Sequence, residues 1–273
     1  MSVIQQNDLI ESVAEAFVRI NRVCPPDYEQ ALRTAATREQ NPKRRDAVHG
    51  YLTECLSEKK EGELIASEPD MAVVFMRVGQ DVHWSGFTGS LQESVSEGIG
   101  RACAEFSLSS PSRDDALPSS RFTAGRSVPV FIHWELVPGE QVQLTVAARS
   151  GQDESKTRLL MKDPQESIAD SVLAQLNELR ESFRFPFVLG IGVGGTAENA
   201  VLTARECLND PLNMAELLDR GPQTSVENLR TEIFRRLNEF SDDAGSFVLR
   251  PPVLDVKIRL RSDRYPVWPI CLM

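Results

Sequence analysis

The sequence lacks any long apolar run, which limits where the protein can work. No stretch reaches the roughly 18 consecutive apolar residues that a helix needs to span a bilayer. The first residues also lack the charged-then-apolar pattern of a secretory signal peptide. We therefore expect a cytoplasmic protein that does not bind membranes.

Basic charge is also scarce. The chain has 30 Lys and Arg residues against 40 Asp and Glu residues, for a formal net charge of −10. Non-specific nucleic-acid binding needs a basic surface, so this class of function is excluded. A local cluster of arginines can still outweigh the global charge at short range, so a small anionic substrate fits the composition.

Metal-binding and nucleophile motifs are missing as well. The five cysteines are scattered, with no CxxC pair and an odd total, which indicates reduced and mostly buried thiols instead of a disulfide framework. The three histidines have no spacing typical of a metal site. No Walker sequence, GxSxG motif or Cys–His pairing is present. These cysteines and histidines are Cys24, Cys55, Cys103, Cys207 and Cys271, and His49, His83 and His133.

The patterns that are present predict a mixed α/β (α+β) fold. Residues 1–60 carry helical apolar spacing, broken at Pro25-Pro26 and Pro42, and form a helical N-terminal layer. Residues 61–273 alternate strand-like and helical stretches. Among the strands, Asp70–Gly79 is predicted to be buried on both faces, and Val253–Arg261 to be half-buried. With no internal repeat and no long linker, we expect one compact domain of mixed sheet and flanking helices over residues 1–273.

The clearest β signal runs from Val128 to Arg149. Two strand-like stretches flank Pro138-Gly139, a pair that suits a type II turn, so the sequence predicts a central β-hairpin. Alternation puts His133 and Glu135 on one face, where the carboxylate could tune the histidine for acid–base work. A histidine that simply lies on the sheet surface is the competing interpretation.

A glycine turn lies between a strand and a helix further along the chain. The glycines at 190, 192 and 195 satisfy GxGxxG before a helix that opens at Thr196. After this helix Asn209-Asp210-Pro211 leads into more helix, without the second strand and acidic residue of a dinucleotide site. The turn is therefore either an anion site at the helix N-terminus or a purely structural connection.

Three segments together resemble a known family. They are MAVVFMRVGQDV from Met71, VPVFIHWELVPGEQV from Val128 and FVLGIGVGGTAENAVLTARECL from Phe187, and they resemble the alpha domain or subunit of iron–sulfur (class I) fumarate hydratases and L-tartrate dehydratases. The resemblance implies a hydro-lyase for small dicarboxylates that uses a four-iron four-sulfur cluster as a Lewis acid. In this family a second, beta part contributes half of the active site, and the resemblance covers only the alpha part. It therefore implies a partner, which is either a separate beta subunit or a second copy of the chain in a homodimer.

The departures from the family fall on the cluster ligands. Ala66 stands where the first cysteine is expected, Arg184 stands near the second, and only Cys271 could match the third. Ala and Arg supply no soft anionic donor. The sequence therefore predicts that no cluster, and no other metal cofactor, is bound.

We therefore predict a cluster-free lyase (a hydratase, a dehydratase or a related acid–base catalyst) that acts on an anionic or carbonyl-containing small molecule. Such an enzyme could belong to a specialised biosynthetic pathway. The acid–base candidates are His133, Glu68 and Glu154. The substrate-binding candidates are Arg121, Arg126, Arg184, Gly192, Gly194, Gly195 and Thr196. The alternatives are a catalytically silent subunit or binding protein, and the alpha subunit of a two-subunit hydro-lyase.

Overall fold

The computed structural model describes residues 3–57, 63–65, 69–108, 111–113, 122–124, 127–179, 186–239, 252–261 and 267–273. These residues form helices and several sheets, so the prediction of a mixed α/β fold is confirmed. The chain divides into two compact units, which differs from the single compact domain expected. Unit 1 is Met1–Cys24 with Ser57–Gly151, and unit 2 is Pro25–Leu56 with Gln152–Met273.

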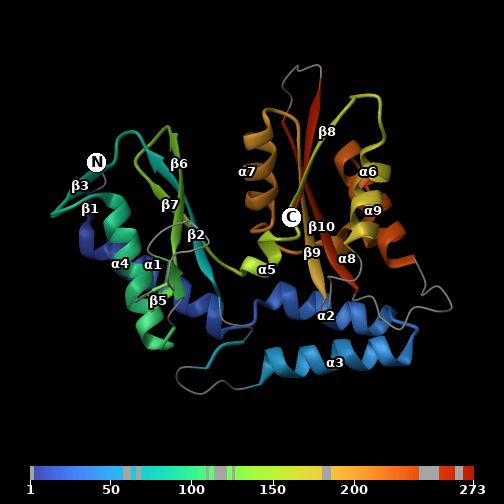
Figure 1. Ribbon diagram of the computed structural model, residues 1–273, viewed down its shortest axis with the longest axis horizontal. Coiled ribbons are helices and arrows are strands. Elements are labelled where there is room, and N and C mark those ends of the chain that lie inside the picture. Colours follow the sequence, from blue (N-terminus) through green and yellow to red (C-terminus); the bar gives the residue numbers. More distant parts are fainter. Residues whose placement is uncertain are drawn as a thin grey trace. The chain divides into compact units, whose positions relative to one another are not determined.

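The central sheet of unit 1 has three strands in the order β6-β2-β7. Strand β2 (Met71–Gly79) pairs in parallel with β6 (Val130–Val137) and antiparallel with β7 (Val142–Arg149) (Figure 1). The predicted hairpin between β6 and β7 is therefore wrong, because β2 lies between the two strands. The strands themselves are where the alternation of the sequence predicts them.

The connection between β6 and β7 crosses the end of β2 at Gly79. The N–H of Gly79 donates to the carbonyl of Gln141 at 2.8 Å, and the N–H of Asp81 donates to the carbonyl of Gly139 at 3.0 Å. A Cβ at Gly79 would lie 2.3 Å from the carbonyl oxygen of Gly139. Only glycine at position 79 lets the turn pass this closely. The Pro138-Gly139 turn can therefore cross the end of β2 and connect β6 to β7 on the other side.

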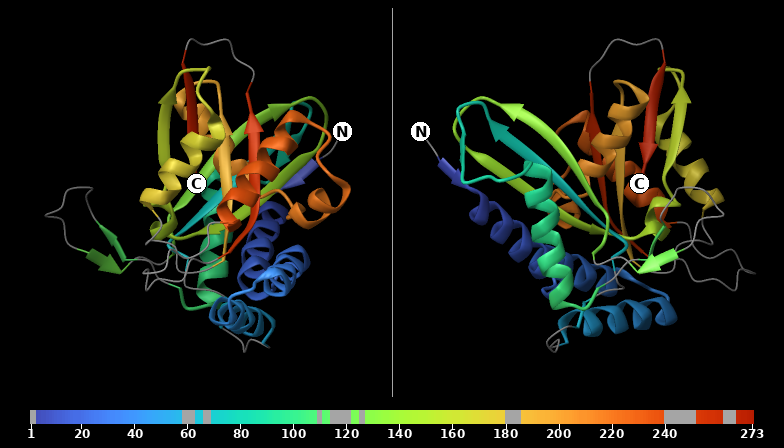
Figure 2. Two further views of the ribbon diagram at one scale, coloured as in Figure 1. Left: turned by 90° about the vertical axis from the view of Figure 1, so that its right-hand side faces the viewer. Right: turned by 60° about the vertical axis from the view of Figure 1, so that its left-hand side comes forward.

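Two helices cover one face of this sheet. They are α1 (Gln6–Arg22) and α4 (Leu91–Glu105), which Figure 2 shows along the same side of the strands. Gly98 of α4 allows their close approach, since a Cβ there would meet the carbonyl oxygen of Ile10 at 2.6 Å. Ser90 and Glu93 form a capping box that fixes the start of α4. The core between helices and sheet includes Val13, Phe17, Val74, Met76, Val95 and Ile99.

Four short strands complete unit 1 as two small pairs. Strands β1 (Val3–Gln5) and β3 (His83–Ser85) pair in parallel. Strands β4 (Pro111–Arg113) and β5 (Phe122–Ala124) pair antiparallel.

Unit 2 is built on a four-stranded sheet of order β10-β9-β11-β8. Its strands are β8 (Arg158–Lys162), β9 (Phe187–Val193), β10 (Val253–Leu260) and β11 (Trp268–Leu272). Strand β9 is parallel to β10 and antiparallel to β11. Helix α7 (Ala197–Cys207) packs on one face, and α6 (Ile168–Glu178) and α9 (Ser225–Glu239) pack on the other (Figure 1).

The remaining helices of unit 2 are α2 (Pro26–Arg38), α3 (Pro42–Leu56), α5 (Gly151–Glu154, which begins at the last residue of unit 1) and α8 (Met214–Arg220). Helices α2 and α3 pack together around Leu32 and Val48, with Leu254 of β10. The predicted N-terminal helical layer is thus divided, because α1 belongs to unit 1 and α2 and α3 to unit 2. None of the helices described is long and apolar enough to cross a membrane.

Candidate functional site

Gly190 and Gly192, which the sequence predicts to be in a turn, lie inside β9, and the turn itself follows Val193. This part of unit 2 is closely packed. A Cβ at Gly192 would lie 2.1 Å from the carbonyl oxygen of Ala200, so this glycine lets β9 lie directly against α7. A Cβ at Gly190 would likewise meet the carbonyl of Ala204 at 2.6 Å. Gly194 and Gly195 have φ values of 88° and 70°, which favour glycine. All four glycines are buried.

The turn offers fewer free donors than the sequence predicts. The N–H of Gly194 donates to the carbonyl of Pro269 at 2.9 Å, and is therefore occupied inside the sheet. Thr196 is the N-cap of α7, and its hydroxyl accepts from the N–H of Asn199 at 3.2 Å. The acidic Glu198 already lies in the first turn, where it complements the helix dipole. Gly192 and Gly194 thus have packing and sheet-forming roles, and of the turn residues expected to bind substrate only Thr196 is exposed.

Glu154 is the acid–base candidate with the best-defined surroundings. It ends α5 and accepts a hydrogen bond at its Oε2 from the Nη2 of Arg205, at 2.6 Å. Arg205 lies in the last turn of α7 and is mostly buried, whereas Glu154 is partly exposed. Such a short charge-assisted bond fixes the orientation of the carboxylate.

Cys271 lies beside this ion pair, enclosed between β11 and α7. Its side chain is fully buried against Ala200 and Ala204. Burial raises the pKa of the thiol to about 11; Arg205 lowers it and Glu154 raises it, both by smaller amounts. The thiol is therefore protonated at neutral pH and packed as a small apolar side chain.

His133 lies on β6 in unit 1. Its ring stacks on Phe75, with ring centroids 5.1 Å apart. The neighbouring Glu135 instead accepts a hydrogen bond from the Nε of Arg77 at 2.8 Å, because Arg77 is its register partner on β2. The Arg77–Glu135 ion pair thus occupies one oxygen of the Glu135 carboxylate, and the tuning of His133 by Glu135 stays a prediction.

Within unit 2, the predicted site residues that the structure describes do not form one cluster. Thr196 and Arg205 lie at opposite ends of α7, roughly 13 Å apart at 1.5 Å per residue. This separates the glycine turn from Glu154. Five further positions of interest lie outside the described residues: Ala66, Glu68, Arg121, Arg126 and Arg184.

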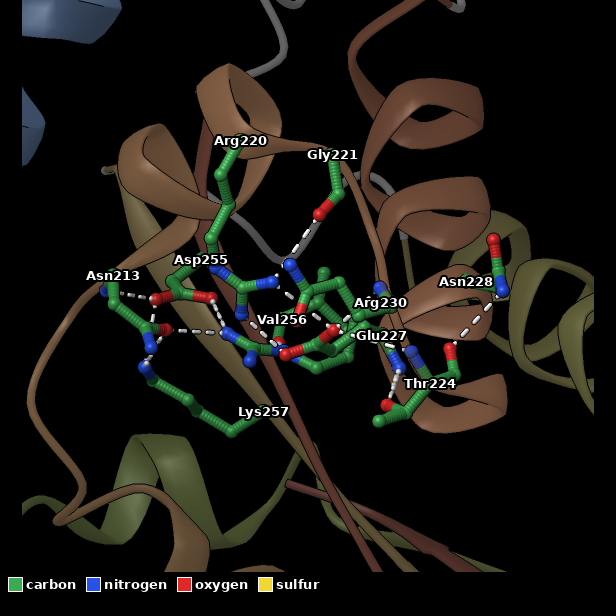
Figure 3. A network of polar contacts seen from close by, with 11 residues as sticks. Asn213, Arg220, Gly221, Thr224, Glu227, Asn228, Arg230, Asp255, Val256 and Lys257 are labelled. Carbon is green, nitrogen blue, oxygen red and sulfur yellow. Dashed lines mark hydrogen bonds and ion pairs between the residues drawn. The ribbon is translucent and has the colours of Figure 1, made fainter.

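A buried charged network in unit 2 was missed by the sequence analysis (Figure 3). Asp255 and Lys257 of β10 are 0% and 4% exposed, and their charged groups lie 2.7 Å apart. Arg230 of α9 donates to Asp255 at 3.0 Å and to the carbonyl of Val256 at 2.6 Å. Asn213 accepts from both cations and donates its N–H to Asp255 at 2.9 Å.

The network explains why β10 is buried from Val253 to Ile258 and not half-buried as predicted. Lys257 also donates to the carbonyl of Pro211, so the segment that leads into α8 is tied to the centre of the strand. A buried charge is tolerated only when paired and hydrogen-bonded, and each member here meets that condition. The detectable signal was two opposite charges two residues apart within the mainly apolar run Val253–Ile258.

Comparison with known proteins identifies the family. The model of a family described as fumarate hydratase (Fumerase) matches residues 10–272, nearly the whole chain. The chain belongs to the fumarate hydratase family. A Methanocaldococcus jannaschii protein with the provisional name L(+)-tartrate dehydratase subunit alpha is 22% identical over 264 residues, which cover 94% of this chain and 90% of that protein.

Membership of the fumarate hydratase family corrects the prediction about cofactors. The family depends on an iron–sulfur cluster, so the expectation of a chain without a cofactor is overturned. In the described part of the chain, no three His, Cys, Asp or Glu side chains are placed to hold a metal ion. Cys103 and Cys207 are buried thiols with raised pKa values, like Cys271. The described residues therefore do not by themselves fit a cluster, and no catalytic step is derived through one.

Proposed function

We propose that this chain is the alpha subunit of a hydro-lyase that removes water from a small anionic hydroxy acid, or adds water to the corresponding unsaturated acid. The match of the fumarate hydratase family model to residues 10–272 carries this proposal. The M. jannaschii relative supports it, because that protein is named as an alpha subunit and is covered over 90% of its length. A separate beta-type chain is then the expected partner.

Glu154 is the acid–base residue that the geometry supports best. Dehydration of a hydroxy acid requires removal of a proton from carbon beside a carboxylate, and a positioned carboxylate can accept that proton. Arg205 holds Oε2 of Glu154 at 2.6 Å, which leaves Oε1 as the oxygen for the transfer. His133 and Glu68 stay as further candidates, and Arg121, Arg126 and Arg184 as candidates for holding substrate carboxylates.

The test is turnover by the chain together with a beta-type partner, prepared without oxygen and supplied with iron and sulfide. Fumarate, L-malate and L-tartrate would be offered, and the carbon–carbon double bond of the unsaturated acid followed by its ultraviolet absorption. We expect turnover that needs both chains. Glu154→Gln should lower kcat by about 100-fold to 10,000-fold, because the amide keeps the hydrogen bond to Arg205 but cannot accept the proton.

Glu166→Gln is the matched control. Glu166 is also a carboxylate of unit 2 in an ion pair, with Lys162 at 2.8 Å, but it lies on the surface. This variant should keep full activity. Full activity of Glu154→Gln would remove the proposed role of Glu154. The complete absence of turnover with every acid, in a complex that forms and holds its iron, would overturn the hydro-lyase proposal and favour a silent subunit.

A further inference from the structure

Strand β6 forms an apolar edge of the unit 1 sheet. Among the residues described, β6 pairs only with β2, so its outer edge has no strand beside it. Phe131, Trp134 and Leu136 are 49%, 45% and 73% exposed. The eight residues contain no Lys, no Pro and no bulge, which are the usual devices that protect an edge strand from pairing.

The edge strand β10 of unit 2 shows what a protected edge looks like in this protein. The side-chain amide of Asn238 bonds both the N–H and the carbonyl of Val253, at 3.1 and 3.2 Å. Arg230 donates to the carbonyl of Val256. Side chains of α9 thus occupy the backbone groups that another strand would use.

The backbone of β6 determines which residues face outward. The carbonyl of Pro129 accepts from the N–H of Ala72 in β2, and the carbonyl of Val137 accepts from the N–H of Gln80, directly after β2. Odd-numbered residues of β6 therefore direct their backbone groups toward β2. By alternation, the N–H and carbonyl groups of Ile132, Trp134 and Leu136 point to the outer edge.

We propose that β6 pairs antiparallel with β6 of a second copy of this chain, about a two-fold axis that passes through Trp134. This register places Trp134 opposite the partner's Trp134 and Leu136 opposite the partner's Ile132. Each of these pairs exchanges two backbone hydrogen bonds. The sheets of the two copies become one six-stranded sheet with an isologous interface.

The side chains match in this register on both faces. On the core face, Ile132 already packs against the unit 1 core, and Leu136 of the partner subunit extends that apolar row. On the opposite face, Glu135 lies across from the partner's His133. An imidazole N–H of the partner's His133 in this position would donate to Glu135 and extend the Arg77–Glu135 ion pair across the interface.

Neighbouring registers match less well. A two-fold axis at His133 sets Glu135 opposite the partner's Phe131, which offers the carboxylate no donor across the interface. An axis at Glu135 sets two carboxylates opposite one another, and sets Ile132 opposite the partner's Pro138, which has no N–H to donate. A perpendicular two-fold axis between antiparallel strands must pass through a residue pair, so intermediate registers do not arise.

Disulfide trapping tests both the partner and the register. Trp134→Cys should form a covalent dimer under mild oxidation, because paired Cα atoms lie about 5.5 Å apart, within disulfide range. Leu136→Cys alone should not, since the two copies of this residue would be about 13 Å apart. Adding Ile132→Cys to Leu136→Cys should restore the covalent dimer. The unchanged protein, with its five native cysteines, is the control.

Mass measurement completes the test, using light scattering after gel filtration. The unchanged protein should have a measured mass of twice the chain mass of 30.4 kDa. The Leu136→Lys variant, at the same concentration, should have a measured mass closer to that of one chain. Met161→Lys is the control: Met161 is 58% exposed on β8, the other edge strand of the unit 2 sheet, and its variant should stay dimeric. Three results would each overturn the proposal. They are a monomer at about 100 µM, a dimer that Met161→Lys breaks and Leu136→Lys does not, and a covalent dimer of His133→Cys instead of Trp134→Cys. Pairing of β6 only with a different chain would also overturn it. These outcomes do not depend on the hydro-lyase assay.

Discussion

The buried network around Asp255 makes a quantitative prediction about stability. Asp255→Asn keeps the shape of the side chain but removes its charge, and its amide nitrogen would face the donors of Lys257 and Arg230. Lys257 then stays buried and 4% exposed without a carboxylate. Removal of one partner from a buried ion pair costs about 3–5 kcal/mol, so this loss in the free energy of unfolding is expected. For a unit of this size it corresponds to roughly 6–20 °C in Tm.

The coupling between Asp255 and Lys257 can be isolated with a double-mutant cycle. Lys257→Met removes the cation that Asp255→Asn leaves unpaired, and a buried pair replaced by neutral side chains is often close to neutral. The double variant should therefore be more stable than Asp255→Asn alone, by about 1 kcal/mol or more.

The assay needs a signal from unit 2 alone, since two units need not unfold together. The chain has three tryptophans, of which only Trp268 belongs to unit 2. A background with Trp84→Phe and Trp134→Phe therefore leaves Trp268 as the reporter in urea unfolding. A cost below about 1 kcal/mol for Asp255→Asn, or costs that simply add in the double variant, would refute the reasoning.

Two further predictions concern packing and pH. Gly192→Ala should lower the free energy of unfolding by about 1–3 kcal/mol, because its Cβ would lie 2.1 Å from the carbonyl oxygen of Ala200. Gly50→Ala in α3, where nothing lies within 4 Å, should raise it by about 0.5–1 kcal/mol, and equal shifts in the urea midpoint would contradict this contrast. Hydrogen bonding to Arg220 lowers the pKa of Glu227 from 4.5 to about 2. The ion pair of Glu227 therefore stabilises the fold above pH 4.5, and this stabilisation is lost as the pH falls toward 2. The free energy of unfolding of Glu227→Gln should fall less steeply than that of the unchanged protein in this pH range. Equal slopes for the two proteins would contradict the prediction.

Local pattern was enough to predict most elements of the fold. The β-branched run at Met71–Gly79 is where the sequence predicts it, and the strand before the glycine turn exists but continues through Gly190 and Gly192 to Val193. The family resemblance was also correct, because it rested on three segments in the right order. Both depend on information that is contiguous in the chain.

Long-range pairing could not be predicted in the same way. Nothing between Val130 and Arg149 indicates that β2 will lie between β6 and β7, since the deciding contact is with Gly79, more than 50 residues earlier. The burial of Asp255 likewise depends on Arg230 and Asn213, which come from other elements. The ion pair between Arg77 and Glu135 was missed for the same reason, because the register partner of Glu135 is more than 50 residues earlier in the chain.

The position of β2 between β6 and β7 also has a consequence for how the chain is made. On the ribosome, residues 71–79 emerge well before residues 130–149, and a lone central strand exposes two unsatisfied edges until both neighbours arrive. A hairpin of β6 and β7 that closed first would exclude β2 from its place and have to reopen. Synthesis in this order therefore favours docking of β6 onto a waiting β2, followed by the turn at Gly139 that delivers β7 to its other side.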